Sequence, residues 1–225
     1  DSAIGNIYAE HHSLGVRLTS VDAVHNEHNI FLRHFTVENL RDESRTIKLF
    51  ISQQFRIFES RRGDTGYFDP RVNAIVHYKG DTALLVNLRS GKKVFDDFNI
   101  GLFGIEGKQG TYFDADDGVL EQNPIEHGSV DSVVGISFSL AGKSSADAHY
   151  WIVCGHSIPE VHTLDELVLQ EGPERLIAST EAYWQAWLGN QTSDLCRLPS
   201  TLQALYARSL LIMRMHADNR GGIIA

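Results

Sequence analysis

The chain has 225 residues, of which 42% are hydrophobic and 22% are charged, as in a soluble globular protein with a sizeable core. Its 29 acidic residues outnumber the 20 basic ones, and the net charge of −9 argues against nucleic acid or an anionic membrane surface as a partner. No apolar run approaches the ~18 residues that span a membrane, and the N-terminus has no signal-peptide pattern. We therefore expect a cytoplasmic protein, or a secreted one if a signal has been removed.

The two cysteines, Cys154 and Cys196, form neither a CxxC motif nor part of a zinc-ligand cluster. Cys154 ends the apolar run WIVC and is expected to be a buried thiol. Because so few cysteines are typical of a reducing compartment, we expect no disulfide.

Alternating apolar and polar residues predict strands over most of the first 160 residues. The predicted strands are residues 15–24, 30–39, 46–59, 74–79, 82–88, 93–103, 129–140 and 149–154. Residues 1–14 carry only weak structure, with a strand end and turn at 4–6, while 61–71 and the acidic, glycine-rich stretch 106–128 are expected to be loops.

Three strand pairs follow from the spacing of these segments. Gly80-Asp81 is a two-residue hairpin turn between 74–79 and 82–88. About five polar residues separate 30–39 from 46–59, which predicts a second antiparallel hairpin, with a bulge or register change at Gln53-Gln54. Segments 129–140 and 149–154 are predicted to form a third pair.

After Cys154 the period becomes helical. Thr163 and Glu166 have capping-box spacing and are expected to open a short helix that Gly172 ends. A second helix is predicted over 174–188, with Pro173 in its first turn and Gly189 closing it. Residues 191–199 read as a polar linker.

A last helix is expected from Ser200, which has capping-box spacing to Gln203. Its apolar residues recur at three- and four-residue steps, and Leu211 and Ile212 widen the stripe beyond one face. Such a helix needs cover on several sides, yet only a short glycine-rich stretch follows it. We interpret it as the first helix of a larger helical domain that is absent; the alternative is a C-terminal helix docked on its own domain.

Strands followed by helices indicate an α+β chain or two domains, here a mainly β, antiparallel sandwich with a helical linker. We place the sandwich at residues 1–160, the linker at 161–199, and the opening helix of the next domain at 200–225.

The acidic stretch 106–128 contains a candidate site. Asp114, Asp116 and Asp117 suggest calcium, but the bidentate glutamate that closes an EF-hand loop would fall at Ile125. Together with Glu121 these carboxylates could supply an acid and base for glycoside chemistry. Nothing in the spacing fixes such a pair, so a solvated acidic loop is the favoured interpretation.

Other motifs also point to no site. His11-His12 and the His25/His28 pair lack a third metal ligand of fixed spacing, and no HExxH, GxSxG or phosphate-loop motif occurs. Aromatic residues at 183, 184 and 187 could stack on sugars, but their helical spacing favours packing. The sequence thus predicts no metal and no cofactor.

Five segments together resemble one family in order along nearly the whole chain. They are GTYFDADDGVLEQNPIEHGSVDS from Gly110, HNEHNIFLRHFTVEN from His25, FDPRVNAIVHYKG from Phe68, TEAYWQAWL from Thr180, and RSLLIMRMHADNRGGIIA from Arg208. The chain resembles the N-terminal part of prokaryotic glucoamylase-type enzymes of glycoside hydrolase family 15. It departs from the family near its start, where a longer β segment usually precedes the equivalent of Ile7. Either residues are missing between Asn6 and Ile7, or the domain is trimmed there.

The resemblance implies a β-supersandwich, a helical linker and an α/α six-fold barrel in which two glutamates perform inverting hydrolysis. A tryptophan-containing Arg-Asp motif just past the first barrel helix would bind the terminal sugar. This sequence ends before these residues, so no catalytic residue is assigned and the substrate-binding residues are unknown. The expected partners are an α-glucan and the chain's own barrel; trehalase or glucodextranase activity, a stand-alone carbohydrate-binding module and a protein-interaction module are the alternatives.

Overall fold

The computed structural model describes residues 2–59, 62–192, 199–218 and 222–223. The strands are β1 Gly5–His11, β2 Val16–Val24, β3 Ile30–Asn39, β4 Arg45–Gln53, β5 Asp64–Asp69, β6 Ala74–Lys79, β7 Thr82–Ser90, β8 Lys93–Val94, β9 Asp97–Leu102, β10 Ile125–Gly128, β11 Val130–Leu140 and β12 Ser145–Gly155. The helices are α1 Ile158–Glu171, α2 Pro173–Thr192 and α3 Ser200–Met215, and two 3₁₀ segments are η1 Ile57–Glu59 and η2 Thr111–Asp117.

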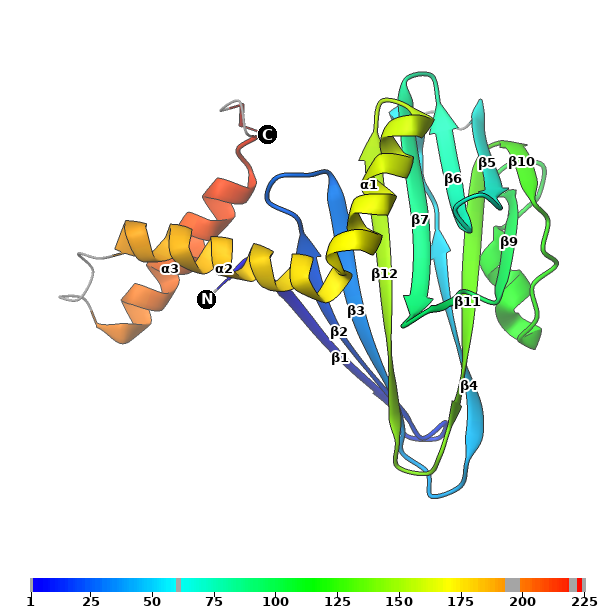
Figure 1. Cartoon of the computed structure of the whole chain (residues 1–225), viewed down its shortest axis with the longest axis horizontal. Coiled ribbons are helices and arrows are strands. Elements are labelled where there is room, and N and C mark those ends of the chain that lie inside the picture. The colour runs from blue at the N-terminus through cyan, green and yellow to red at the C-terminus, as the bar shows by residue number, and fades with distance from the viewer. Residues whose placement is uncertain (1, 60–61, 193–198, 219–221, 224–225) are drawn as a thin grey trace.

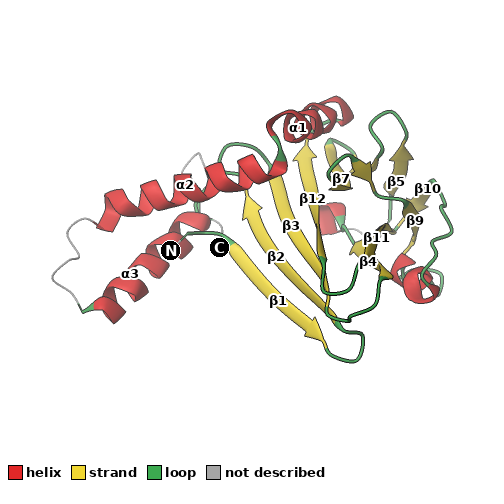
Figure 2. Cartoon of the chain, turned by 60° about the horizontal axis from the view of Figure 1, so that its bottom comes forward, coloured by secondary structure: helices red, strands yellow, loops and turns green. Residues whose placement is uncertain are grey.

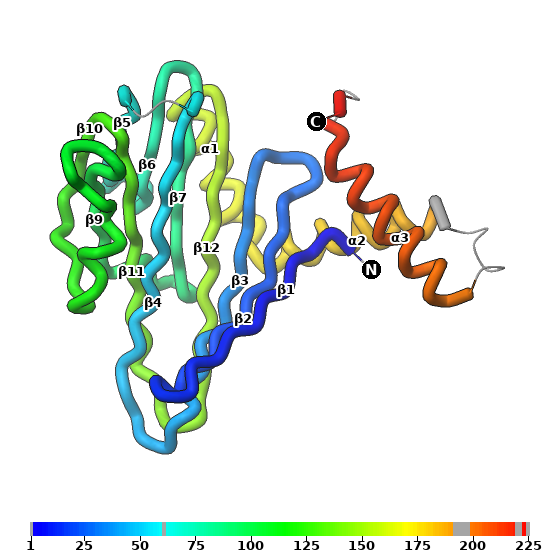
Figure 3. Tube along the Cα trace, turned by 180° about the vertical axis from the view of Figure 1, so that it is seen from behind, coloured from blue at the N-terminus to red at the C-terminus, as the bar shows by residue number. Residues whose placement is uncertain are grey.

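The strands form two antiparallel sheets that face each other (Figure 1). The larger sheet has the order β1-β2-β3-β12-β7-β6-β5-β10, with β8 paired to the end of β7. The smaller sheet, seen from behind in Figure 3, has the order β4-β11-β9. The predicted antiparallel β-sandwich followed by helices is therefore confirmed.

One hydrophobic core fills the space between the two sheets. Val86 and Leu88 of β7 and Tyr150 of β12 meet Ile136 and Phe138 of β11 across it. Alternate residues of each strand point to the same face, so one face of the larger sheet supplies this core.

The opposite face of the larger sheet carries a second core, beneath α1. Val161 and Val168 of α1 lie seven residues apart, on one side of the helix, and pack with Leu85 and Trp151. Figure 1 shows α1 lying along β12 and β7. The central strands are therefore buried on both faces.

Helices α2 and α3 extend away from the sandwich and lie beside each other (Figure 2). A small cluster of Leu188, Ala207 and Leu211 joins them. Most other apolar side chains of α3 are exposed among the described residues, including Leu205 at 63% and Met213 at 61%. The domain boundaries at residues 160 and 199 stay a prediction.

Two of the predicted hairpins are wrong. β3 pairs with β2 and β12, whereas β4 pairs with β11 in the other sheet. In the same way β11 pairs with β4 and β9, whereas β12 pairs with β3 and β7. Each short connection carries the chain from one sheet to the other, so consecutive strands face each other across the core. The hairpin of β6 and β7 is confirmed, with Lys79 opposite Thr82.

Several predicted loops contain regular structure. Residues 5–11 form β1, which pairs with β2 through Asn6 and Ile7 without interruption. The predicted loop 61–71 contains β5, and the stretch 106–128 contains η2 and β10. The predicted strand 46–59 ends at Gln53, and a 3₁₀ turn follows, so the double glutamine marks a strand end and not a bulge.

The helix boundaries differ from the predicted capping boxes. Ser157 caps α1 by accepting a hydrogen bond from Glu160 N, while the Thr163 hydroxyl donates back to Pro159 O inside the helix. Gly172 does end α1, but α2 continues past Gly189. The residue before α3 is Pro199, and no side-chain cap is formed there.

Cys154 is half-buried and carries a free thiol, while Cys196 and most of the predicted linker 191–199 lie outside the described residues. Among the helices that the structure describes, none is both long and apolar enough to cross a membrane.

Candidate functional site

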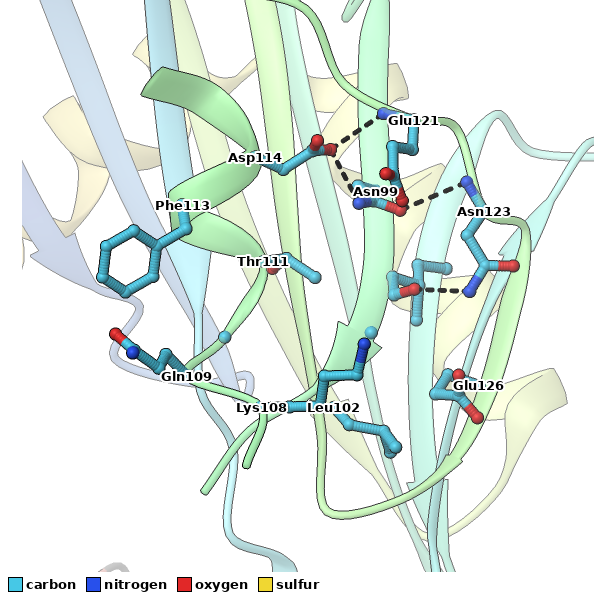
Figure 4. A pocket seen from close by; sticks show the side chains of 13 residues that line it. Asn99, Leu102, Lys108, Gln109, Thr111, Phe113, Asp114, Glu121, Asn123 and Glu126 are labelled. Carbon is cyan, nitrogen blue, oxygen red and sulfur yellow. Dashed lines mark hydrogen bonds between the residues drawn. The ribbon is translucent and has the colours of Figure 1, made fainter. Parts of the chain in front are cut away.

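A polar pocket of about 420 Å³ opens beside the acidic loop between β9 and β11 (Figure 4). Strand β9 forms one wall, and η2 with the run into β10 forms the others. The pocket is lined by Asn99, Ile100, Gly101, Leu102, Lys108, Gln109, Gly110, Thr111, Phe113, Asp114, Glu121, Asn123 and Glu126.

Asp114 holds the loop closed. One of its oxygens, Oδ2, accepts hydrogen bonds from Asn99 Nδ2 at 2.7 Å and from the Glu121 backbone N–H at 2.8 Å. Asn123 fixes the next stretch, donating from its backbone N to Asn99 Oδ1 and from Nδ2 to Ile100 O at 2.6 Å. These bonds cross-link a long connection to β9, so the pocket is pre-formed.

A buried carboxyl group lies behind the pocket. Asp131 is fully buried, and its Oδ2 accepts a hydrogen bond from the Thr111 backbone N–H at 2.7 Å. Asp131 Oδ1 and Thr111 Oγ1 have no hydrogen-bond partner among the described residues. Burial raises the pKa of Asp131, because a charged carboxylate is poorly solvated there.

Two glycines let the backbone approach this carboxyl group. A Cβ at Gly101 would lie 2.7 Å from Thr111 Cγ2, and a Cβ at Gly110 would lie 2.8 Å from Asp131 Oδ2. Gly110 also has a φ of 126°, a region that favours glycine. The close approaches at positions 101 and 110 therefore require glycine.

The margin of the pocket combines aromatic and charged groups. Phe113 is 46% exposed and its ring lies 4.4 Å from that of Tyr112, which is also exposed. Figure 4 shows Phe113 at one side of the pocket and Glu126 at the other. Exposed aromatic faces beside carboxylates and amides can bind a hydroxyl-rich ligand, since the ring packs on C–H groups and the polar groups accept hydrogen bonds.

The predicted acidic residues divide into different roles. Asp114 is used to hold the loop, and Asp117 Oδ1 accepts a hydrogen bond from Val119 N within the same turn. Asp116 is exposed outside the pocket, and Glu121 lines it. Of this set the structure brings only Asp114 and Glu121 to the pocket, and Asp114 is already engaged in hydrogen bonds that hold the loop. Sequence reasoning missed Asn99, Thr111 and Asp131, because each lies on a different element.

The histidines do not assemble a metal site. Across the described ranges no group of three His, Cys, Asp or Glu residues is close enough to hold a metal ion. His25 and His28 stack on each other with ring centroids 5.2 Å apart, at the turn between β2 and β3. His12 instead lies 3.0 Å from Glu10 on the exposed β1–β2 hairpin.

The aromatic residues of α2 pack on one another. Trp184 has edge contacts with both Tyr183 and Trp187, and the two tryptophans lie against the α2–α3 cluster. The favoured prediction of packing is therefore the arrangement found.

No family model and no curated protein matches the chain. Among solved structures, a bacterial glucoamylase complexed with acarbose matches 96% of this chain with a TM-score of 0.73 and 15% identity. The chain spans 31% of the length of that glucoamylase. At this identity the likeness shows a shared fold, which includes the helices as well as the sandwich.

Two further structures are less similar. A putative kojibiose phosphorylase from the human microbiome matches 76% of this chain, which spans 21% of its length, with a TM-score of 0.43 and 9% identity. A family GH92 alpha-mannosidase from Bacteroides thetaiotaomicron matches 82% of this chain, which spans 23% of its length, with a TM-score of 0.43 and 10% identity.

Proposed function

We propose that this chain is the N-terminal, non-catalytic domain of a glucoamylase-like glycoside hydrolase that releases glucose from α-glucans by inverting hydrolysis. The observation that carries the proposal is the fold shared with the bacterial glucoamylase over 96% of this chain. The resemblance of five ordered segments to glycoside hydrolase family 15 supports it. Trehalase or glucodextranase activity is the alternative within the same family of glycoside hydrolases.

The acid and base of the reaction lie beyond residue 225 in this proposal. The acidic loop offers Glu121 and Glu126 at the pocket, but its most constrained carboxylate, Asp114, is engaged in holding the loop. Inverting hydrolysis needs two carboxyl groups on opposite sides of the scissile bond.

The partner of α3 is the enzyme's own catalytic barrel. Large apolar side chains on α3 are exposed among the described residues, namely Leu202, Leu205, Tyr206, Ile212, Met213 and Met215. Full burial of such a side chain contributes about 1.5–3 kcal/mol, and because these are already about half covered, a domain packed on this face would add roughly half of that for each.

The activity is tested by comparing two proteins. Residues 1–225 and a longer product of the same gene that includes the downstream domain are assayed for glucose released from maltooligosaccharides, dextran and trehalose. The proposal expects release only by the longer protein. Hydrolysis by residues 1–225 alone would refute the non-catalytic role, and inactivity of the longer protein on all three substrates would refute the activity.

The barrel contact is tested separately with Leu205→Asp. Because Leu205 is 63% exposed, the substitution is expected to change the stability of residues 1–225 by less than about 0.5 kcal/mol. In the longer protein it buries a charge and is expected to cost about 2 kcal/mol or more. Phe58→Asp is a control on a similarly exposed apolar residue of the sandwich. If Leu205→Asp changed the stability of both proteins equally, the contact between α3 and the barrel would be contradicted.

A second candidate function, carbohydrate binding by the sandwich itself, is favoured by the exposed Phe113 at the polar pocket. Calorimetric titration of residues 1–225 with maltooligosaccharides tests it. Binding that Phe113→Ala abolishes and Phe58→Ala leaves intact would establish this site, while absence of heat would remove the candidate.

A further inference from the structure

A second pocket, of about 390 Å³, lies between the α1–α2 junction and strands β7 and β12. Figure 1 shows where α1 ends and α2 begins. We call this pocket the joint pocket. It is lined by Arg89, Gly91, Lys92, His149, Trp151, Leu169, Pro173 and Glu174. His149 and Trp151 lie on one face of β12, while Arg89 near the end of β7 and Lys92 in the turn after it supply the basic groups.

His149 is buried but lacks a hydrogen bond at its ring Nε2. The residue is 7% exposed, and Nε2 has no hydrogen-bond partner among the described residues. Glu174 Oε1 lies 3.3 Å away, without the geometry of a hydrogen bond. The ring of His34 stacks on the His149 ring, with the two ring centroids 4.6 Å apart. A buried polar atom of this kind requires a partner, and the pocket is where one can reach it.

Two cationic side chains border the same space. Arg89 is directly opposite His149 in the register of β7 and β12, and its guanidinium donates two long hydrogen bonds, of 3.4 Å to Asn87 Oδ1 and 3.5 Å to Val72 O. Lys92 is exposed and has no ion pair or hydrogen bond with any described residue. The positive charge of the pocket is therefore available to a ligand.

The first turn of α2 points at the pocket as well. The helix begins at Pro173, which has no N–H, and Leu176 N donates to Gly172 O, so the first-turn donors that face the pocket are the N–H groups of Glu174 and Arg175. The N-terminal end of a 20-residue helix carries a partial positive charge. Helix end, basic side chains and the unsatisfied His149 Nε2 together fit one chemical class of ligand.

We propose that the joint pocket binds a small oxyanion, the phosphate or carboxylate group of a free ion or a metabolite. His149 Nε2 and Lys92 donate to its oxygens, and Arg89 supplies further charge. In the unliganded chain the carboxylate of Glu174 lies near His149, and its side chain is 69% exposed, so it can turn into solvent when the anion binds. Leu169 and Pro173 provide an apolar wall for the body of a larger ligand.

The experiment is a titration of residues 1–225 with inorganic phosphate. Binding is measured by calorimetry and by NMR of the histidine side chains. Saturable binding that shifts the His149 ring signals is expected. Lys92→Ala should weaken it about fivefold and Glu174→Gln should tighten it about threefold, since one removes an attractive and the other a repulsive charge. Lys108→Ala makes the same charge change at the other pocket and should leave the affinity unaltered.

Glucose 6-phosphate and acetate distinguish the sources of the oxyanion. Tighter binding of glucose 6-phosphate than of phosphate would assign a phosphorylated sugar, and tighter binding of acetate would assign a carboxylate. Absence of saturable binding for all three ligands, or binding that neither Lys92→Ala nor Glu174→Gln alters, would overturn the proposal. Both variants replace exposed side chains, so loss of folding does not obscure the result.

Discussion

The buried carboxylate of Asp165 ties α1 to the larger sheet. Its Oδ1 accepts hydrogen bonds from Trp151 Nε1 at 2.7 Å and from Asn87 Nδ2 at 3.1 Å, and all three residues are at most 1% exposed. Asp165→Ala would leave both donors buried without an acceptor. Each unsatisfied donor costs about 1–3 kcal/mol, so for the two donors we expect a loss of about 2–6 kcal/mol in the free energy of unfolding.

Urea denaturation followed by circular dichroism measures this loss, with Glu166→Ala as the matched control. Glu166 is the next residue of α1, is exposed, and accepts only a surface hydrogen bond from Gln170, so its replacement should cost less than about 0.5 kcal/mol. A double-mutant cycle with Trp151→Phe should show a coupling of about 1 kcal/mol or more. Additive effects, or a loss below about 0.5 kcal/mol for Asp165→Ala, would refute the reasoning.

Three further predictions concern stability. Ser157→Ala should cost about 1 kcal/mol in urea denaturation because it removes the cap of α1, whereas Thr163→Ala should cost less than half as much; the reverse order would contradict the cap. Gly189→Ala should raise the thermal midpoint, with a gain of about 0.5–1 kcal/mol, since the position lies inside α2 with open space around its Cβ; a lower midpoint would show a hidden contact. Burial lowers the pKa of His77 from 6.5 to about 4, so the unfolded chain binds a proton that the folded chain does not. Stability should therefore fall as the pH drops from 6.5 toward 4, by up to about 1.4 kcal/mol per pH unit, and His77→Gln should flatten this slope; an equal slope in the variant would exclude His77 as its source.

Elements with local signals can be predicted from the amino-acid sequence. The hairpin of β6 and β7 follows from alternation on both sides of Gly80-Asp81, because a two-residue turn places the second strand directly beside the first. The end of α1 at Gly172 and the helical period of α3 were read in the same way. The segregation of strands before helices was sufficient to predict a sandwich followed by helices.

Strand pairing and the contacts between distant polar residues depend on the folded protein and are not visible in local patterns. Alternation shows that a segment is a strand but not which partner it has, and connections of four or five residues are long enough to leave one sheet for the other. Thus β3 and β4 face each other across the core, and so do β11 and β12. Neither pocket could be predicted, because its residues are far apart in the sequence. Asn99 reaches Asp114 through closure of the loop, and Arg89 lies opposite His149 through the register of the sheet. Both depend on the packing of the whole sandwich.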